Sequence, residues 1–356
     1  MSNRSEPMLS AYLHSRGAEL GLPVSGTFEL TSRCNFSCPM CYVHLQNAKS
    51  EQELTATQWL ELAQRGKDRG MVFVLLTGGE PFLRKDFFEI YEGMRAMGLM
   101  ITINTNGSLL TGEIRRKLIE NPPVRLNISL YGGCDETYRN MCGQPAFDTV
   151  VNNIRSLKEA GIDVRLNYSI ISQNRQDMKK ILDISREMNV QIKASSYMYP
   201  PSRLDCSTSC NRLTAEESAA CAVEWDRLRL SPEELMQRRM SVQNLECAVE
   251  YDDGVGCRAG VTSFWITWDG HMLPCGMMTG PFVDVLDCGF DHAWDQIRSA
   301  VKQIHLPAEC RTCSKRSVCS VCAAVCQSET GKFDAVPDYV CRRTDEMLQL
   351  MRKDIQ

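Results

Sequence analysis

The chain lacks the features that would mark a membrane, secreted or nucleic-acid-binding protein. None of its apolar runs is long enough to cross a bilayer as a helix. The first twenty residues contain no apolar segment with a cleavage site, as a secretory signal would. The formal net charge of −4 over 356 residues gives no general attraction to nucleic acid or to an anionic membrane. We therefore expect a globular protein of the cytoplasm that binds neither.

Cysteine is the residue type that the chain has in excess, with 18 in total. In a reducing compartment such a number favours metal binding over disulfides. Three of the cysteines lie within the first 41 residues, ten lie between Cys247 and Cys341, and only five lie in the centre. This distribution predicts two separate metal-binding regions.

The first region reads CNFSCPMC and follows a strand-like run at 26–31. Cys34, Cys38 and Cys41 have a spacing that can hold three irons of a [4Fe–4S] cluster, which leaves the fourth iron open for chemistry. A structural zinc site would need a fourth ligand, and His44 is close enough in sequence to supply one. The motif alone leaves both interpretations open.

Strand-like and helix-like segments alternate after this motif. Strands are predicted at 27–31, 71–76, 99–104, 124–130, 163–171 and 190–197, and amphipathic helices at 57–69, 85–97, 111–120, 147–160 and 176–188. Such alternation predicts parallel strands with right-handed crossovers, in either an open barrel or a doubly wound sheet. In both, the active site lies at the carboxyl ends of the strands, where the cysteine motif is found.

Polar residues follow the next three predicted strands. The second strand ends in TGGEP at 77–81, the third in NTNG at 104–107, and the fourth in SLYG at 129–132. The two glycines allow the backbone to approach a ligand closely, and Glu80 adds a carboxylate at the same edge. A plain Gly-Gly turn before a helix is the alternative for TGGEP on its own.

Together, CNFSCPMC, TGGEP, TNG and SLYG resemble the radical S-adenosylmethionine (SAM) superfamily over residues 26–200. The resemblance implies an α/β fold, a partial (β/α)6 TIM-like barrel, with Cys34, Cys38 and Cys41 holding a [4Fe–4S] cluster whose open iron is chelated by SAM. It also implies a set of SAM contacts: Gly78, Gly79 and Glu80 at the amino group, Asn104 or Asn106 near the ribose, Ser129, and Arg139 at the carboxylate.

The chemistry implied by this resemblance is reductive cleavage of SAM to a 5′-deoxyadenosyl radical, which abstracts a hydrogen atom from a substrate. Two positions depart from the usual pattern. Met40 stands where an aromatic residue commonly precedes the third cysteine, and Tyr131 stands where the fourth motif more often has aspartate. Tyr131 therefore cannot be assigned the role of that aspartate.

The second cysteine region resembles the SPASM extension, which carries auxiliary [4Fe–4S] clusters. Gly270-x4-Cys275 and Cys310-x2-Cys313-x5-Cys319 follow its pattern, whereas Ala323 stands at the position of the next expected cysteine. The resemblance implies one or two auxiliary clusters and the domain order 1–25 N-terminal segment, 26–200 barrel, 201–246 helical linker and 247–356 SPASM domain.

The family pattern divides the auxiliary cysteines into two sets. The outer cluster would use Cys310, Cys313, Cys319 and Cys341. The inner cluster would use Cys257, Cys275 and Cys322, with Cys326 or Cys247 as a fourth ligand or with one iron left open. A zinc-ribbon-like site on Cys310, Cys313, Cys319 and Cys322 is the alternative.

Most of the remaining cysteines are expected to be small buried hydrophobic residues. Cys142, near the fourth strand, and the pair Cys206 and Cys210 are instead candidate hydrogen-atom donors.

The resemblance favours a ribosomally made peptide as substrate, modified by cross-linking, thioether formation, epimerisation or oxidation. Gly276 after Cys275 argues against formylglycine formation, because sulfatase maturases of this type have a catalytic aspartate there. With about 25 residues before the first strand, leader recognition would need a separate leader-peptide-binding protein or a different surface of this one. A small molecule such as a sugar or amino acid derivative is the alternative substrate, and a non-enzymatic electron carrier the alternative class. An electron donor such as flavodoxin or ferredoxin is expected.

Overall fold

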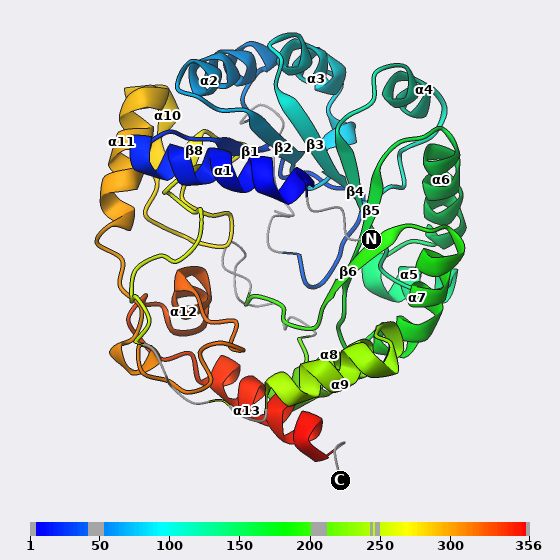
Figure 1. Ribbon diagram of the computed structural model, residues 1–356. Coiled ribbons are helices and arrows are strands. Elements are labelled where there is room, and N and C mark those ends of the chain that lie inside the picture. The colour runs from blue at the N-terminus through cyan, green and yellow to red at the C-terminus, as the bar shows by residue number, and fades with distance from the viewer. Residues whose placement is uncertain (1–4, 42–52, 201–211, 243–244, 246–249, 354–356) are drawn as a thin grey trace.

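The computed structural model describes residues 5–41, 53–200, 212–242, 245 and 250–353. Six parallel strands form an arc in Figure 1, and helices cover its outer face. The strands are β1 (Ser25–Glu29), β2 (Phe73–Thr77), β3 (Met100–Thr105), β4 (Arg125–Ser129), β5 (Val164–Ser169) and β6 (Gln191–Ser195). The helices between them are α2 (Ala56–Asp68), α3 (Phe87–Ala96), α4 (Gly112–Glu120), α5 (Asp135–Cys142), α6 (Phe147–Glu159) and α7 (Met178–Glu187). The predicted partial barrel is confirmed.

The sheet continues beyond β1 with three strands from the cysteine-rich region. Its order is β6-β5-β4-β3-β2-β1-β7-β8-β9, and it does not close. β7 (Ser263–Ile266) pairs parallel with β1, whereas β8 (His271–Leu273) and β9 (Val283–Asp284) continue antiparallel. The first part of the cysteine-rich region is thus built onto the barrel sheet. The domain boundary at 247 stays a prediction.

The strands have the alternation that a half-barrel requires. In β4, Leu126 and Ile128 are fully buried against the helices, while Asn127 and Ser129 point to the other, less buried face. Near β1 the outer core is aromatic: Phe28 stacks on Trp59 of α2 with ring centroids 5.3 Å apart. Packing on the helical side therefore leaves the polar residues of the strands facing the inside of the barrel.

The remaining helices complete the ring. Figure 1 shows α8, α9 and α13 beside the end of β6, and α10 and α11 at the opposite end of the sheet, with α12 between them. Their bounds are α8 (Ala215–Arg229), α9 (Pro232–Ser241), α10 (Val285–Cys288), α11 (Phe290–Val301), α12 (Ala323–Thr330) and α13 (Asp338–Lys353). Short 3-10 turns occur at Pro81–Leu83, Arg175–Asp177 and Ala308–Cys310. Among the described residues, no helix has the length and apolar character needed to cross a bilayer.

The helices α1 (Ser5–Leu20), α5 and α10–α13 were not predicted from the sequence, and α1 is the first of them. The segment before β1 forms α1, which is held by a 2.7 Å hydrogen bond between His14 and Thr262. Its apolar residues do not gather on one face, because Leu9, Tyr12 and Leu20 are all exposed. The amphipathic pattern that identified the five predicted barrel helices is therefore absent here.

Candidate active site

A cavity of about 310 Å³ lies at the carboxyl ends of the strands. This volume is in the range of small-molecule sites, roughly 300–1,000 Å³. All six parallel strands contribute to its wall, through residues at their carboxyl ends or in the segments that follow. They supply Cys34, Phe36, Cys38, Met40, Cys41, Thr77, Gly78, Gly79, Asn104, Thr105, Asn106, Ser129, Tyr131, Asn167, Ser169, Ser195, Tyr197, Met198 and Tyr199, and Met277 comes from the cysteine-rich region. The structure thus brings the first cysteine motif together with the residues of TGGEP, TNG and SLYG.

The three cysteines of the first motif share this wall. The backbone N–H of Cys41 donates to the carbonyl oxygen of Cys38 over 3.1 Å, and the side-chain amide of Asn106 lies 3.8 Å from the sulfur of Cys34. Burial raises the pKa of Cys34 to about 12, and the nearby Glu80 adds to the effect. Without a metal the thiol is therefore protonated, and binding of an iron–sulfur cluster would release its proton.

Three thiols on one side of a cavity suit a cluster better than a single ion. Among the residues that the structure describes, no three His, Cys, Asp or Glu side chains converge on one point where a metal ion would be held. Cys34, Cys38 and Cys41 instead border a shared volume, as the ligands of a cubane do. His44, the residue that a zinc site would use, lies outside the described residues.

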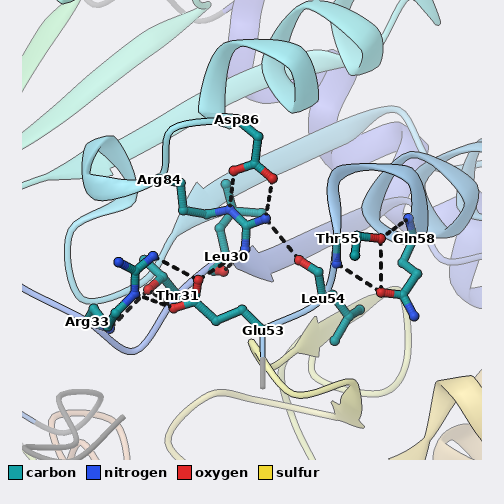
Figure 2. Close-up of polar contacts among 9 residues, drawn as sticks. All are labelled: Leu30, Thr31, Arg33, Glu53, Leu54, Thr55, Gln58, Arg84 and Asp86. Carbon is teal, nitrogen blue, oxygen red and sulfur yellow. Dashed lines mark hydrogen bonds and ion pairs between the residues drawn. The ribbon is translucent and has the colours of Figure 1, made fainter. Parts of the chain in front are cut away.

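A buried ion-pair network holds the start of the cysteine loop (Figure 2). Arg33, directly before Cys34, forms a two-point contact with Glu53 at 2.8 and 2.9 Å. Arg84 lies 3.5 Å from the same carboxylate, pairs with Asp86 at 2.7 Å, and donates to the carbonyl oxygen of Leu30 at 2.8 Å. The side chains of Glu53 and Arg84 are only 4% exposed. The network therefore fixes the loops after β1 and β2 relative to each other.

The two glycines of TGGEP pack directly on the cysteine loop. The N–H of Gly79 donates to the carbonyl oxygen of Thr31 over 2.7 Å, and the N–H of Glu80 donates to that of Arg33 over 2.9 Å. A Cβ on Gly79 would lie 2.2 Å from the Arg33 oxygen, and one on Gly78 would lie 2.5 Å from the Thr31 oxygen. Glycine is therefore required here for close packing of two loops, in addition to any contact with a ligand.

Glu80 does not line the cavity. Its carboxylate is completely buried and accepts hydrogen bonds from the Thr105 hydroxyl at 2.8 Å and from the backbone N–H of Asn106 at 2.7 Å. Burial raises the pKa of Glu80 to about 7, although these hydrogen bonds oppose the rise. The direct contact between Glu80 and SAM stays a prediction; what the structure shows is that Glu80 positions the loop after β3.

The other predicted SAM contacts divide into two groups. Asn104, Asn106 and Ser129 line the cavity, and the Asn104 side chain accepts a 2.9 Å hydrogen bond from Asn127. Arg139 is exposed on α5 and does not line the cavity. Its interaction with a SAM carboxylate also stays a prediction.

Two residues contact Cys38 from the side of β4 and α5. The thiols of Cys38 and Cys142 share a hydrogen bond, which with burial raises the pKa of Cys38 well above its usual value, and the Tyr131 phenol also hydrogen-bonds to Cys38. Cys142 is 1% exposed and is not among the residues that line the cavity. Its role as a hydrogen-atom donor stays a prediction, as do those of Cys206 and Cys210, which lie outside the described residues.

The predicted outer cysteine set is brought together. Cys310, Cys313, Cys319 and Cys341 line one small cavity of about 30 Å³, together with Thr344, whose hydroxyl lies 3.6 Å from the sulfur of Cys319. Burial raises the pKa of Cys310 to about 11, and the neighbouring thiols of the set contribute. Cys341, from α13, takes the place that Cys322 would have in a zinc ribbon.

The predicted inner set lies near a tyrosine that sequence reasoning missed. Cys257, Cys275 and Cys322 all interact with Tyr199, which hydrogen-bonds to Cys322 and also lines the cavity of about 310 Å³. Burial raises the pKa of this phenol above its usual value. Cys326 is fully buried in α12, near Cys310, Cys319 and Cys322, and so lies between the two sets. Cys247 lies outside the described residues.

Comparisons with known proteins agree with this arrangement. Residues 28–184 match the family model described as the radical SAM superfamily. The chain is 25% identical over 330 residues to an AdoMet-dependent heme synthase of Methanosarcina barkeri. This alignment covers 86% of this chain and 93% of the relative. Among solved structures, Streptococcus suis SuiB bound to S-adenosylmethionine has a TM-score of 0.67 at 17% identity, covering 96% of this chain and 81% of SuiB. Native anSMEcpe with bound AdoMet has a TM-score of 0.70 at 17% identity, covering 94% and 100%.

The fold and the cysteine-lined cavity define an enzyme built on a partial α/β barrel with a cysteine-rich extension. Residues 28–184 match the radical SAM superfamily, and the similar solved structures SuiB and anSMEcpe hold S-adenosylmethionine. The structural matches extend through the cysteine-rich region, as expected of a SPASM-type extension.

Proposed function

We propose that the protein cleaves SAM reductively and abstracts a hydrogen atom from a peptide substrate. The observation that carries this proposal is the single cavity in which Cys34, Cys38 and Cys41 face Gly78, Gly79 and the polar strand ends. When bound, the cluster supplies the electron that splits SAM into methionine and a 5′-deoxyadenosyl radical, which takes a hydrogen atom from the substrate.

The residues of the cavity have separate tasks in this proposal. Cys34, Cys38 and Cys41 hold the cluster, while peptide groups of Gly78 and Gly79 and the side chains of Asn104, Asn106 and Ser129 bind SAM. Glu80 acts at a distance, because its carboxylate fixes the backbone of Asn106. Phe36, Met40 and Met277 supply apolar wall that limits the access of water. Arg139 contributes to SAM binding only if the carboxylate of SAM reaches the outside of α5.

The cysteine-rich region holds the auxiliary clusters in this proposal. Cys310, Cys313, Cys319 and Cys341 bind the outer cluster around their shared cavity, and Cys257, Cys275 and Cys322 bind the inner one beside Tyr199. Cys326, placed between the two sets, is available to either. Because Tyr199 also lines the SAM cavity, a cluster held by Cys257, Cys275 and Cys322 would be near that cavity and could supply electron transfer there.

A peptide substrate is supported by two structural neighbours. SuiB has been solved with the precursor peptide SuiA, and anSMEcpe with AdoMet and the Cp18Cys peptide. A small-molecule substrate is the second candidate, since the sequence relative that covers most of the chain is an AdoMet-dependent heme synthase. An external donor such as flavodoxin or ferredoxin would reduce the first cluster, and a separate protein would bind a leader peptide.

The proposal is tested on protein reconstituted anaerobically with iron and sulfide. Reduced protein should convert SAM to 5′-deoxyadenosine, and alanine at Cys34, Cys38 or Cys41 should abolish the conversion while the auxiliary irons remain. The matched control is Cys134→Ala, directly before α5, which should still convert SAM to 5′-deoxyadenosine. Retained cleavage in Cys38→Ala, or none in the wild type with its clusters intact, would refute the proposal. Candidate peptides and tetrapyrroles are then compared as acceptors by deuterium transfer into 5′-deoxyadenosine.

A further inference from the structure

A second cavity of about 460 Å³ adjoins the active-site cavity and has no role in the mechanism above. It lies where the edge strand β6 meets α8, α9 and α13. Ser195, at the end of β6, lines both cavities. The two cavities therefore share part of their wall at Ser195.

The wall of this second cavity is strongly cationic. It contains Lys193, Arg229, Arg238 and Arg343 but only one carboxylate, Asp226, in a chain whose net charge is −4. Asp226 already pairs with Arg229 at 2.7 Å and also with Arg238. Within the part of the chain that the structure describes, neither Lys193 nor Arg343 has a carboxylate partner.

Arg343 is held in a fixed position by neutral groups. Its Nε donates to the Ser218 hydroxyl at 2.8 Å and its Nη2 to the Ser196 hydroxyl at 3.3 Å. Both serines are buried and are bonded to each other's carbonyl oxygens at 2.7 and 2.8 Å. A half-buried guanidinium held in this way loses part of its hydration without gaining a counter-ion, and a carboxylate ligand would offset that loss.

The rest of the wall is apolar. Ile170, Trp225 and Met347 are buried residues that face the cavity beside Arg343. The combination of an apolar surface and a fixed arginine suits a carboxylate at the end of an aliphatic arm, and it is a poor match for a bare inorganic anion, which has no apolar part.

We propose that this cavity is a carboxylate-binding subsite, in which Arg343 and Lys193 bind an acidic group of the substrate while the reacting C–H bond lies beyond Ser195 in the active-site cavity. The subsite rests on the proposed function, because it is the substrate of the SAM reaction that it holds. The carboxylate belongs to an acidic side chain of a peptide or to a small carboxylic acid, and the chemistry of recognition is the same for both.

Two probes separate these sources: N-acetyl-tetraglutamate for the acidic peptide and succinate for the small acid. Binding is followed by the change in tryptophan fluorescence, because Trp225 lines the cavity. The same titration of Trp225→Phe shows how much of the change comes from Trp225. We expect saturable binding of at least one probe and none of N-acetyl-tetralysine. Arg343→Gln should weaken binding about tenfold or more, the loss of one charged hydrogen bond. Arg343→Lys should restore part of it, and Lys193→Gln should weaken it less.

Arg342→Gln is the matched control, because Arg342 is next on the same helix but is exposed and pairs with Asp338 and Glu216. It should bind the probes like the wild type. Equal binding by Arg343→Gln and the wild type, or no binding of either glutamate peptide or succinate, would overturn the subsite.

The two proposals can fail separately. Cleavage of SAM without substrate should be unchanged in Arg343→Gln, whose thermal unfolding also shows whether the variant is folded. A wild type that binds a probe but cannot cleave SAM would refute the proposed reaction and leave the carboxylate site. A wild type that cleaves SAM but binds neither probe would refute the site alone.

Discussion

The backbone N–H of Asn106 donates a 2.7 Å hydrogen bond to the carboxylate of Glu80. This bond joins the loop after β2 to the loop after β3, directly behind the wall of the active-site cavity. A residue predicted to touch SAM is thus used to position one that lines the cavity. The bond also places an ionisable group in the interior, with consequences for stability.

Glu80 should make the metal-free protein less stable as the pH rises from 4.5 to 7. Its pKa is raised from 4.5 to about 7 by burial, so the folded state holds a proton there that the unfolded state has already lost. The contribution of Glu80 to the free energy of unfolding is therefore fully present below pH 4.5 and is lost by pH 7. The free energy of unfolding should fall by about 3 kcal/mol between these two pH values. Urea unfolding at several pH values measures it. Glu80→Gln should lack this slope, whereas the exposed Glu89→Gln should keep it; parallel curves for all three proteins would contradict the prediction.

Gly79→Ala should disrupt the cysteine loop. The new Cβ would lie 2.2 Å from the carbonyl oxygen of Arg33, so one of the two loops must move. A displacement of this kind costs on the order of 100-fold in the rate of SAM cleavage. The rate of 5′-deoxyadenosine formation and the iron content provide the measurement. Gly98→Ala is the control for a glycine change without a steric clash, because its Cβ would meet no atom within 4 Å; its φ of +83° makes this a strict control, since the backbone there is strained by alanine and that of Gly79 is not. Equal rates of 5′-deoxyadenosine formation in Gly79→Ala and Gly98→Ala would show that close packing of Gly79 on the cysteine loop is not needed for SAM cleavage.

Tyr131→Phe should lower the reduction potential of the first cluster. The Tyr131 phenol hydrogen-bonds to Cys38, and a donor to a ligand sulfur stabilises the reduced, more negative cluster. Loss of one such bond corresponds to a shift on the order of tens of millivolts. A redox titration followed by electron paramagnetic resonance measures the shift. Tyr12→Phe, on the exposed face of α1, is the control and should leave the potential unchanged. An unshifted potential in Tyr131→Phe would mean that the phenol does not bond to the liganded sulfur.

Cys341→Ala should remove the outer cluster and about four irons per chain. Cys341 is one of the four thiols that line the small cavity in the cysteine-rich region. Cys288→Ala is the control, because Cys288 belongs to neither set and is bonded to the backbone of Asp284. Metal analysis after reconstitution decides the outcome. An unchanged iron content would remove Cys341 from the ligands, and zinc in place of iron would favour the zinc alternative.

The strands and helices of the barrel were largely predictable from local pattern. The second strand was predicted at 71–76 and is found at Phe73–Thr77, and the helix predicted at 147–160 is Phe147–Glu159. Such elements bury one face on a common core, so their periodicity is visible in the sequence. Helices α1, α5 and α10–α13 and the short strands β7–β9 were not predicted. Helix α1 has no apolar face, and the three strands have two to four residues each.

The candidate site was predictable only in part. Glycines, asparagines and cysteines at successive strand ends are expected to converge at one edge of a parallel sheet, and most of them do. Whether a side chain then faces the cavity depends on local packing. Glu80 turns into the core, Arg139 stays outside, and Tyr199 enters from beyond β6 to stand beside Cys322.

The sequence by itself determined the candidate cluster ligands, because such a motif is specified by residue type and by spacing within one short loop. For that reason Cys34, Cys38 and Cys41 can be identified as candidate ligands without a structure. Only the tertiary structure decided which distant segments surround them. Met277 reaches the active-site cavity, and Arg343 of α13 meets β6, through packing between segments far apart in the chain. Local sequence patterns do not predict such contacts, because the contacts depend on the curvature of the whole sheet and on which segments pack beside its two edge strands.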